Sequence, residues 1–211
     1  MIIELPTEID RDAWLGRLGA RDYEGLGGRL EKAEAELLRA SGPRGTFTFS
    51  DIYEMPGTAI KKHLADCRKM ILMGVTLGPG VDAAIRSAAA VDMAYSLFLD
   101  SGASILIEQA ADIFTEKLKN ELPADMPYMT GRYSPGYGDL PIGIQDDLAA
   151  RIDAQRRIGL TISKTHLMIP RKSITAIIGI SDKPVSGYLA VCSECALRDK
   201  CELRKTGRIC G

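Results

Sequence analysis

The feature that most constrains the fold is a nearly unbroken apolar run at residues 69–77, with the sequence KMILMGVTL. The run has the length of a strand, and Gly78-Pro79-Gly80 closes it. A strand exposed on one face would alternate polar and apolar residues, so a continuous apolar run indicates burial on both faces. We therefore expect this segment to lie in the middle of a sheet.

Other segments show the spacing of helices or of shorter strands. Apolar residues that recur every three or four positions indicate helices, and short β-branched or alternating runs between turn residues indicate strands. The predicted helices are residues 29–40, 58–67, 81–100, 103–118 and 146–157, the last ending at Gly159. The predicted strands, besides the central one, are residues 46–49, 160–163, 173–180 and 187–191, the last two forming a hairpin. Periodicity does not give the order of the strands.

Size and charge exclude several classes of protein. A chain of 211 residues with 45% hydrophobic residues and a net charge of -1 can bury the core of one globular domain. It lacks the excess of lysine and arginine that binding to nucleic acid requires. Charges at Asp82, Arg86 and Asp92 interrupt its most apolar window, which argues against a membrane span. No export signal is evident near Met1, so we expect a cytoplasmic protein.

A glycine-rich segment at residues 131–141, GRYSPGYGDLP, has the composition of a ligand-binding loop. Gly136 and Gly138 lack a Cβ, so the backbone there can adopt positive φ and approach another molecule closely. Pro135 favours an extended conformation at the preceding residue, and Arg132 offers a planar fork of donors that suits a carboxylate. The alternative is an ordinary surface turn with packed tyrosines and a solvated arginine.

Two acids on the predicted helix 103–118 could complement a cationic ligand. Glu108 and Asp112 are four residues apart, and so lie on one face of the helix. Like charges at this spacing destabilise a helix slightly unless water or a cation relieves them. The alternatives are an acidic wall that meets a cationic ligand and two solvated carboxylates.

Four of the five cysteines are concentrated near the end of the sequence, at Cys192, Cys195, Cys201 and Cys210. Disulfides are disfavoured in a reducing compartment, so a metal site is the leading interpretation. Four thiolates could hold a zinc ion or a 4Fe-4S cluster, and neighbouring basic residues would favour a negatively charged cluster. The spacing matches neither the bacterial nor the plant ferredoxin pattern, and reactive or disulfide-forming thiols are the alternative. Cys67 is expected to be a small core residue.

Common catalytic signatures are missing from the sequence. There is no G-x-S-x-G elbow, phosphate-binding loop or dinucleotide fingerprint. The two histidines, His63 and His166, are far apart and have no ligand spacing, so neither supports a functional hypothesis. The commonest hydrolase, NTPase and dehydrogenase functions are therefore disfavoured.

Several segments together resemble the activation (reactivation) domain of cobalamin-dependent methionine synthase. The loop at residues 132–141 resembles the arginine, proline, glycine, tyrosine signature of that family, and residues 74–78 resemble its strand ending in threonine and glycine. Residues 110–118 resemble the helix before the signature, and residues 168–173 with 186–191 resemble the closing hairpin.

The resemblance implies a fold and a division of the chain. It implies a single C-shaped α+β domain with a largely antiparallel, twisted sheet flanked by helices. This domain would cover residues 1–191, with a helical N-terminal part at residues 1–45. Residues 192–211 form a Cys-rich tail that is foreign to the fused domain of methionine synthase. The N-terminal ligand contact of that family has no clear counterpart in residues 1–47.

The resemblance also implies a ligand, S-adenosylmethionine, and the residues that contact it. Arg132 would hold the carboxylate, and Asp112 would face the amino group; Glu108 is added from the acidic pair described above. The remaining implied contacts are the backbone of Ser134, Pro135 and Gly136, and the rings of Tyr137 and Tyr188. One cationic fork, an acid and aromatic faces suit a zwitterion that carries an additional sulfonium.

The implied role is that of an accessory protein in reductive remethylation of cobalamin. The partner would be the cobalamin-binding module of methionine synthase or another corrinoid protein, with a reductase such as flavodoxin or ferredoxin as electron donor. The chain would then contribute to a methyltransferase activity by positioning, without an acid, base or nucleophile of its own. The alternatives are a metal-dependent interaction or electron-transfer module that does not bind S-adenosylmethionine, and an enzyme acting on a small anionic substrate at the same loop.

Overall fold

The structure, a computed structural model, describes residues 1–19 and 28–187. These residues divide into two compact units. The first, which we call the helical unit, comprises Met1–Thr46, Gly74–Glu121 and Ala149–Ile174. The second, the loop unit, comprises Phe47–Met73, Leu122–Leu148 and residues 175–187 of the described chain. The predicted division at residues 191 and 192 lies outside the described residues and stays a prediction.

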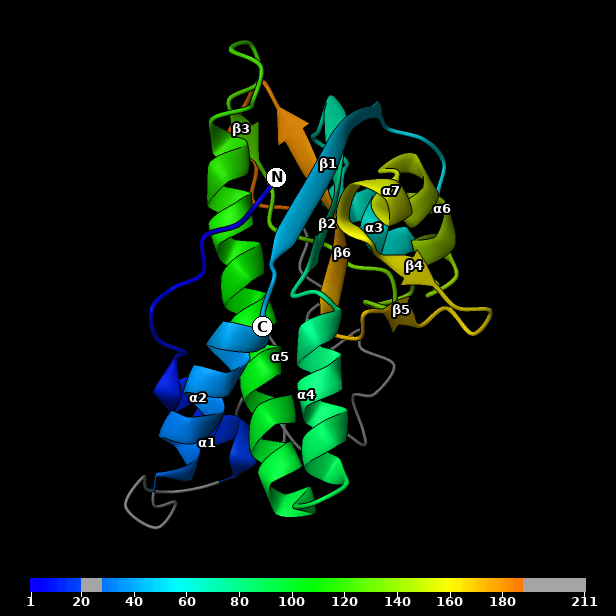
Figure 1. The fold of residues 1–211 in the computed structure, drawn as a ribbon. Helices are drawn as coiled ribbons and strands as arrows, with labels where there is room; N and C mark the ends of the chain where they lie inside the picture. Colours follow the sequence, from blue (N-terminus) through cyan, green and yellow to red (C-terminus); the bar gives the residue numbers. More distant parts are fainter. Residues whose placement is uncertain (20–27, 188–211) are drawn as a thin grey trace. The chain divides into compact units, whose positions relative to one another are not determined.

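The main sheet confirms the expected α+β class and the expected place of the apolar run. Its strand order is β1 (Arg44–Asp51), β2 (Lys69–Thr76), β6 (Ser173–Ser181) and β3 (Tyr128–Met129). β2 therefore lies between two neighbours, and all its residues after Lys69 are buried. β3 pairs antiparallel with β6, with Tyr128 opposite Ser181. Helices flank this antiparallel sheet (Figure 1).

Four helices dominate the helical unit: α1 (Arg11–Leu18), α2 (Arg29–Ala40), α4 (Pro79–Ala89) and α5 (Met93–Lys119). The long α5 packs against each of the other three, and α2 also packs against α4 (Figure 1). α2 has the predicted bounds. Its buried stripe contains Leu30, Ala33 and Leu37, which face away from a surface of charged residues.

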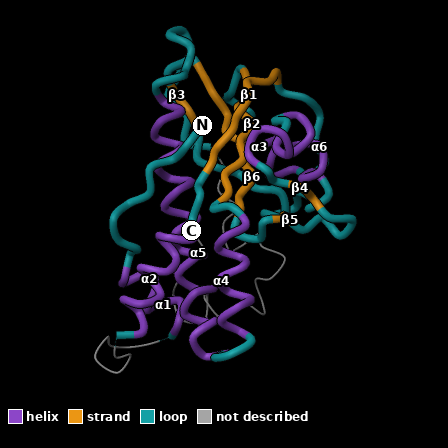
Figure 2. The backbone as a smooth tube through the Cα atoms, viewed as in Figure 1, coloured by secondary structure: helices purple, strands orange, loops and turns teal. Residues whose placement is uncertain are grey.

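The predicted boundary between two helices at residues 100–103 is wrong. The chain turns earlier, between α4 and α5, and α5 continues through Ser101 and Gly102 (Figure 2). Asp92 begins α5 as its N-cap, accepting a hydrogen bond from the backbone N–H of Tyr95 at 2.9 Å. Gly102 is a packing position, because a Cβ there would overlap the indole ring of the buried Trp14.

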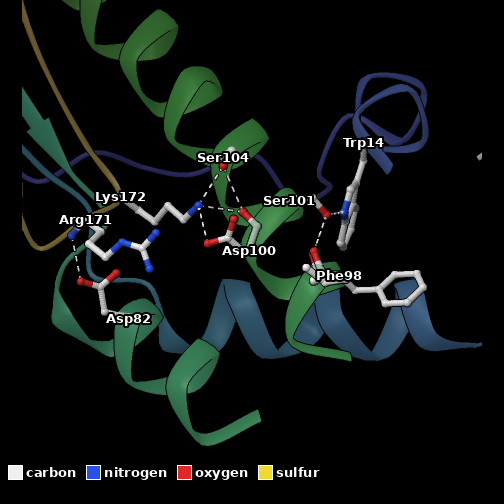
Figure 3. A network of polar contacts seen from close by, with 9 residues as sticks. Trp14, Asp82, Phe98, Asp100, Ser101, Ser104, Arg171 and Lys172 are labelled. Carbon is white, nitrogen blue, oxygen red and sulfur yellow. Dashed lines mark hydrogen bonds and ion pairs between the residues drawn. The ribbon is translucent and has the colours of Figure 1, made fainter. Parts of the chain in front are cut away.

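A buried lysine joins the start of β6 to α5 (Figure 3). The ammonium of Lys172 donates hydrogen bonds at 2.8 Å to the carbonyl of Asp100 and to the hydroxyl of Ser104. Its Nζ also lies 2.9 Å from the Asp100 carboxylate. The neighbouring Arg171 donates its backbone N–H to Asp82 of α4 at 2.8 Å. Burial lowers the pKa of Lys172, although the partnership with Asp100 opposes this shift.

The predicted helix at residues 146–157 is divided in two, α6 (Ile144–Arg151) and α7 (Ala154–Ile158). Asp153 lies between them with a φ of 51°, a left-handed conformation that a continuous helix does not contain. Gly159 ends α7 as predicted, with a φ of 72°. β4 (Thr161–Ile162) falls inside the predicted strand at residues 160–163 and pairs with β5 (Met168–Ile169).

The loop unit contains the shortest of the predicted helices. α3 (Thr58–His63) stops four residues before its predicted end, because Leu64 leaves the helical conformation and Cys67 instead donates its N–H to the Leu64 carbonyl at 3.0 Å. Cys67 is half-buried against Gly179 of β6, in agreement with a packing role, and burial raises the pKa of its thiol. In the described parts of the chain, no helix is both long and apolar enough to cross a membrane.

Candidate functional site

The glycine-rich loop, residues 131–141, lies in the loop unit between β3 and α6. Tyr133 fastens it to β6: Tyr133 and Ile177 exchange two backbone hydrogen bonds, each 2.8 Å long. The Tyr133 side chain is completely buried. One of the two tyrosines of the loop is therefore an anchor, a packing role that the surface-turn alternative also contains.

Two turns follow the anchor. The N–H of Tyr137 donates to the Ser134 carbonyl at 3.0 Å, and that of Leu140 donates to the Tyr137 carbonyl at 3.0 Å. Gly136 has a φ of 91° and Gly138 a φ of 54°, the left-handed conformations expected from the sequence. The N–H of Gly136 also donates to the Leu140 carbonyl at 2.9 Å. The backbone of the loop is thus held by hydrogen bonds between its own residues.

The side chains of the loop differ in accessibility. Tyr137 is 47% exposed, and its ring meets that of Tyr133 edge-on, with 6.1 Å between centroids. Arg132 and Ser134 are partly exposed, whereas Pro135 is buried. On this loop Tyr137 and the backbone of Gly136 are therefore among the exposed parts, and the proline ring lies on the inner side.

Asp139 connects the end of the loop to α3. Its carboxylate accepts the backbone N–H of Thr58 at 2.6 Å, the hydroxyl of Thr58 at 2.7 Å and the N–H of Ala59 at 3.0 Å. These hydrogen bonds, chiefly the one from the Thr58 hydroxyl, lower the pKa of Asp139 to about 2. The sequence analysis did not single out Asp139, since its partners lie 81 and 80 residues away.

His63 connects the beginning of the loop to the same helix. The imidazole is buried, and its Nε2 lies 2.8 Å from the hydroxyl of Thr130 and 3.2 Å from the carbonyl of Gly131. The ring of His63 lies 5.0 Å from that of Tyr133, centroid to centroid. Sequence reasoning missed this residue, because a single histidine in a helix has no spacing that marks it.

The remaining predicted site residues belong to the helical unit or lie outside the described residues. Glu108 and Asp112 are exposed on α5, in the helical unit, whereas Arg132 belongs to the loop unit. A shared ligand contact for these acids stays a prediction. Tyr188 and the four cysteines, Cys192, Cys195, Cys201 and Cys210, lie outside the described residues. Within residues 1–19 and 28–187, no group of three or more His, Cys, Asp or Glu side chains could hold a metal ion.

Fold and loop together define an α+β domain that presents a glycine-rich loop fastened to an antiparallel sheet. No family model and no curated protein sequence matches the chain. One similar solved structure is the crystal structure of the MetH reactivation domain bound to AdoHcy, with a TM-score of 0.62 over 95% of this chain and 82% of that chain. The two sequences are 16% identical. The chain thus has the fold of the MetH reactivation domain, which confirms the fold resemblance seen in the sequence.

Proposed function

We propose that this chain binds S-adenosylmethionine at the glycine-rich loop and supports reductive remethylation of the cobalamin of a corrinoid protein. The observation that carries the proposal is the fold, which is that of a reactivation domain whose crystal structure holds AdoHcy. The loop supports it independently, because it joins a partly exposed arginine to a glycine backbone with positive φ on an anchored base.

The proposed ligand and the loop are chemically complementary. The guanidinium of Arg132 would hold the carboxylate, since its planar fork can donate two parallel hydrogen bonds. The exposed ring of Tyr137 would lie against the sulfonium, a cation that aromatic faces attract. Asp112 and Glu108 would face the amino group, and Tyr188 would border the adenosine. The backbone of residues 134–136 would complete the contact.

Beyond binding, we propose a positioning role. The methyl group would pass from the sulfonium of the ligand to the reduced cobalt of the partner, leaving S-adenosylhomocysteine on this chain. Such a transfer needs no proton to be moved, so the chain would contribute by holding the donor in line with the cobalt. The partner would be the cobalamin-binding module of methionine synthase or another corrinoid protein in the cytoplasm. A flavodoxin or ferredoxin would deliver the electron that reduces the cobalt.

The cysteine-rich tail supports a further part of the proposal, a metal centre. Four thiols within residues 192–211 form a donor set that suits a 4Fe-4S cluster or a zinc ion. A cluster would give the chain its own electron relay toward the corrinoid. Anaerobic purification followed by iron, sulfide and zinc analysis tests this. A brown protein with visible thiolate-to-iron absorption supports a relay, whereas a colourless protein with one equivalent of zinc contradicts it.

The cysteine tail also favours a second candidate function, a metal-dependent interaction module that does not bind S-adenosylmethionine. Calorimetric titration of the full chain with S-adenosylmethionine and with S-adenosylhomocysteine separates the two. We expect binding, and we expect Arg132→Ala to abolish it. Arg156→Ala is the matched control, because Arg156 is an exposed arginine of α7 that pairs with Asp153. Absence of binding by the unaltered chain would favour the second function. Binding that Arg132→Ala leaves equal would instead contradict the proposed role of Arg132.

A further inference from the structure

The two ends of α3 contact the two ends of the glycine-rich loop. At its N-terminal end, Thr58 and Ala59 donate to Asp139 of the loop. At its C-terminal end, His63 meets Gly131, where the loop begins. A helix of six residues is about 9 Å long. Both ends of the loop are therefore attached to one helix outside the loop.

The N-terminal contact replaces the cap that α3 lacks. The N-cap residue is Gly57, which has no side chain to accept the first N–H groups of the helix. The Asp139 carboxylate supplies that acceptor, and a negative charge is favourable at this end of a helix. Gly57 has a φ of 109°, and a Cβ there would lie 2.9 Å from Asp139 Oδ1. Because Gly57 has no side chain, α3 needs a cap from another segment. The missing Cβ also leaves space for the Asp139 carboxylate.

The C-terminal contact holds two segments of the chain at once. The Thr130 hydroxyl lies 2.8 Å from His63 Nε2 and accepts the Gly179 N–H of β6 at 2.9 Å. On another side of the ring, a Cβ at Gly187 would lie 2.7 Å from His63 Cε1. Because the peptide unit is planar, holding the Gly131 carbonyl also orients the amide that begins Arg132. His63 therefore contacts Gly131, the residue before Arg132, and is approached closely by Gly187.

We propose that α3 is a two-ended clamp that pre-organises the loop, and that His63 and Asp139 are positioning residues for its ligand. This inference rests on the proposed function of the loop. A segment with glycines at residues 131, 136 and 138 loses much conformational freedom when it is ordered. If a clamp already orders the loop when the chain folds, ligand binding does not have to supply the free energy for that ordering. Neither side chain needs to touch the ligand.

Calorimetry with S-adenosylhomocysteine tests the clamp in the full chain. We expect His63→Ala and Asp139→Ala each to weaken binding about tenfold, the equivalent of one well-formed hydrogen-bonding contact. His63→Gln and Asp139→Asn place a hydrogen-bonding amide at these positions, and should recover most of the affinity, since asparagine is itself a good helix cap. Asp182→Ala is the control, because Asp182 is a carboxylate of the same unit that pairs with Arg68; it should bind like the unaltered chain.

Hydrogen exchange gives a second readout that does not depend on any ligand. In both alanine variants we expect faster amide exchange at residues 131–141, with unchanged exchange in β2. Variants with unaltered circular dichroism, unaltered loop exchange and unaltered affinity would refute the clamp. If the unaltered chain binds no S-adenosylhomocysteine, the proposed function fails. The exchange measurement then still decides whether α3 orders the loop.

Discussion

The carboxylate of Asp139 accepts both the backbone N–H and the hydroxyl of Thr58, at 2.6 and 2.7 Å, across a separation of 81 residues. This pair joins the end of the glycine-rich loop to the first turn of α3. The hydrogen bonds favour the charged carboxylate, so they are strongest while Asp139 is ionised. The attachment of the loop should consequently depend on pH.

We predict that part of the stability of the chain is lost in acid through Asp139. The pKa of Asp139 falls from 3.8 to about 2 on folding. A folded-state pKa below the unfolded value gives stability that is complete above about pH 4 and disappears as pH falls toward 2. Urea unfolding from about pH 5 to about pH 2.5 checks this. The stability difference between the unaltered chain and Asp139→Asn should shrink with acid, and a constant difference would contradict the prediction.

A second prediction concerns the partly buried ion pair between Lys172 and Asp100 in the helical unit. The Lys172 side chain is 10% exposed and lies against Asp100 and Ser104 (Figure 3). Lys172→Ala removes the pair and the packed stem, so we expect a loss of about 3 kcal/mol in the free energy of unfolding. Lys172→Met keeps the stem, and should lose about 1 kcal/mol because Asp100 is exposed enough to be hydrated. Equal losses in denaturant titrations would show that only the charge matters.

A third prediction concerns the close approach of α1 and α5. Alanine is intrinsically better than glycine inside a helix by about 1 kcal/mol. At Gly102, however, a Cβ would overlap the Trp14 ring, so we expect Gly102→Ala to destabilise the chain by about 1 to 3 kcal/mol. Gly42→Ala is the matched control, since a Cβ at Gly42 meets nothing within 4 Å. In thermal unfolding, the midpoint temperature should fall for Gly102→Ala and stay unchanged for Gly42→Ala. A neutral result would mean that Trp14 moves aside.

The elements that sequence reasoning located correctly are those whose signal is local. The run that forms β2 and the apolar stripe of α2 each carry their whole pattern within one segment. The boundary expected at Gly102 was wrong because that glycine serves a contact with Trp14, a residue from the distant N-terminal part of the chain. Glycine in a sequence does not distinguish a helix stop from a packing position.

The candidate site divides in the same way. The two turn glycines were predicted correctly because glycine beside proline has a direct conformational meaning. The ligand contact of Arg132 follows from its chemistry and stays a prediction. His63 and Asp139 were not predicted, because their importance depends on partners that lie 68 and 81 residues away. A histidine in a helix and an aspartate in a turn each have common structural roles, and only the fold shows which groups they meet.

The last prediction concerns how Tyr137 distinguishes two forms of the ligand. S-adenosylmethionine carries a sulfonium and S-adenosylhomocysteine does not, so a ring against the sulfur favours the former by cation–π attraction. At an exposed ring this attraction corresponds to about a two- to fivefold preference. We expect Tyr137→Ala to remove the preference and Tyr137→Phe to keep it, in paired calorimetric titrations. Tyr128→Ala is the control, because Tyr128 is 41% exposed but lies on β3. Equal losses for both ligands would instead place the ring against the adenosine that they share.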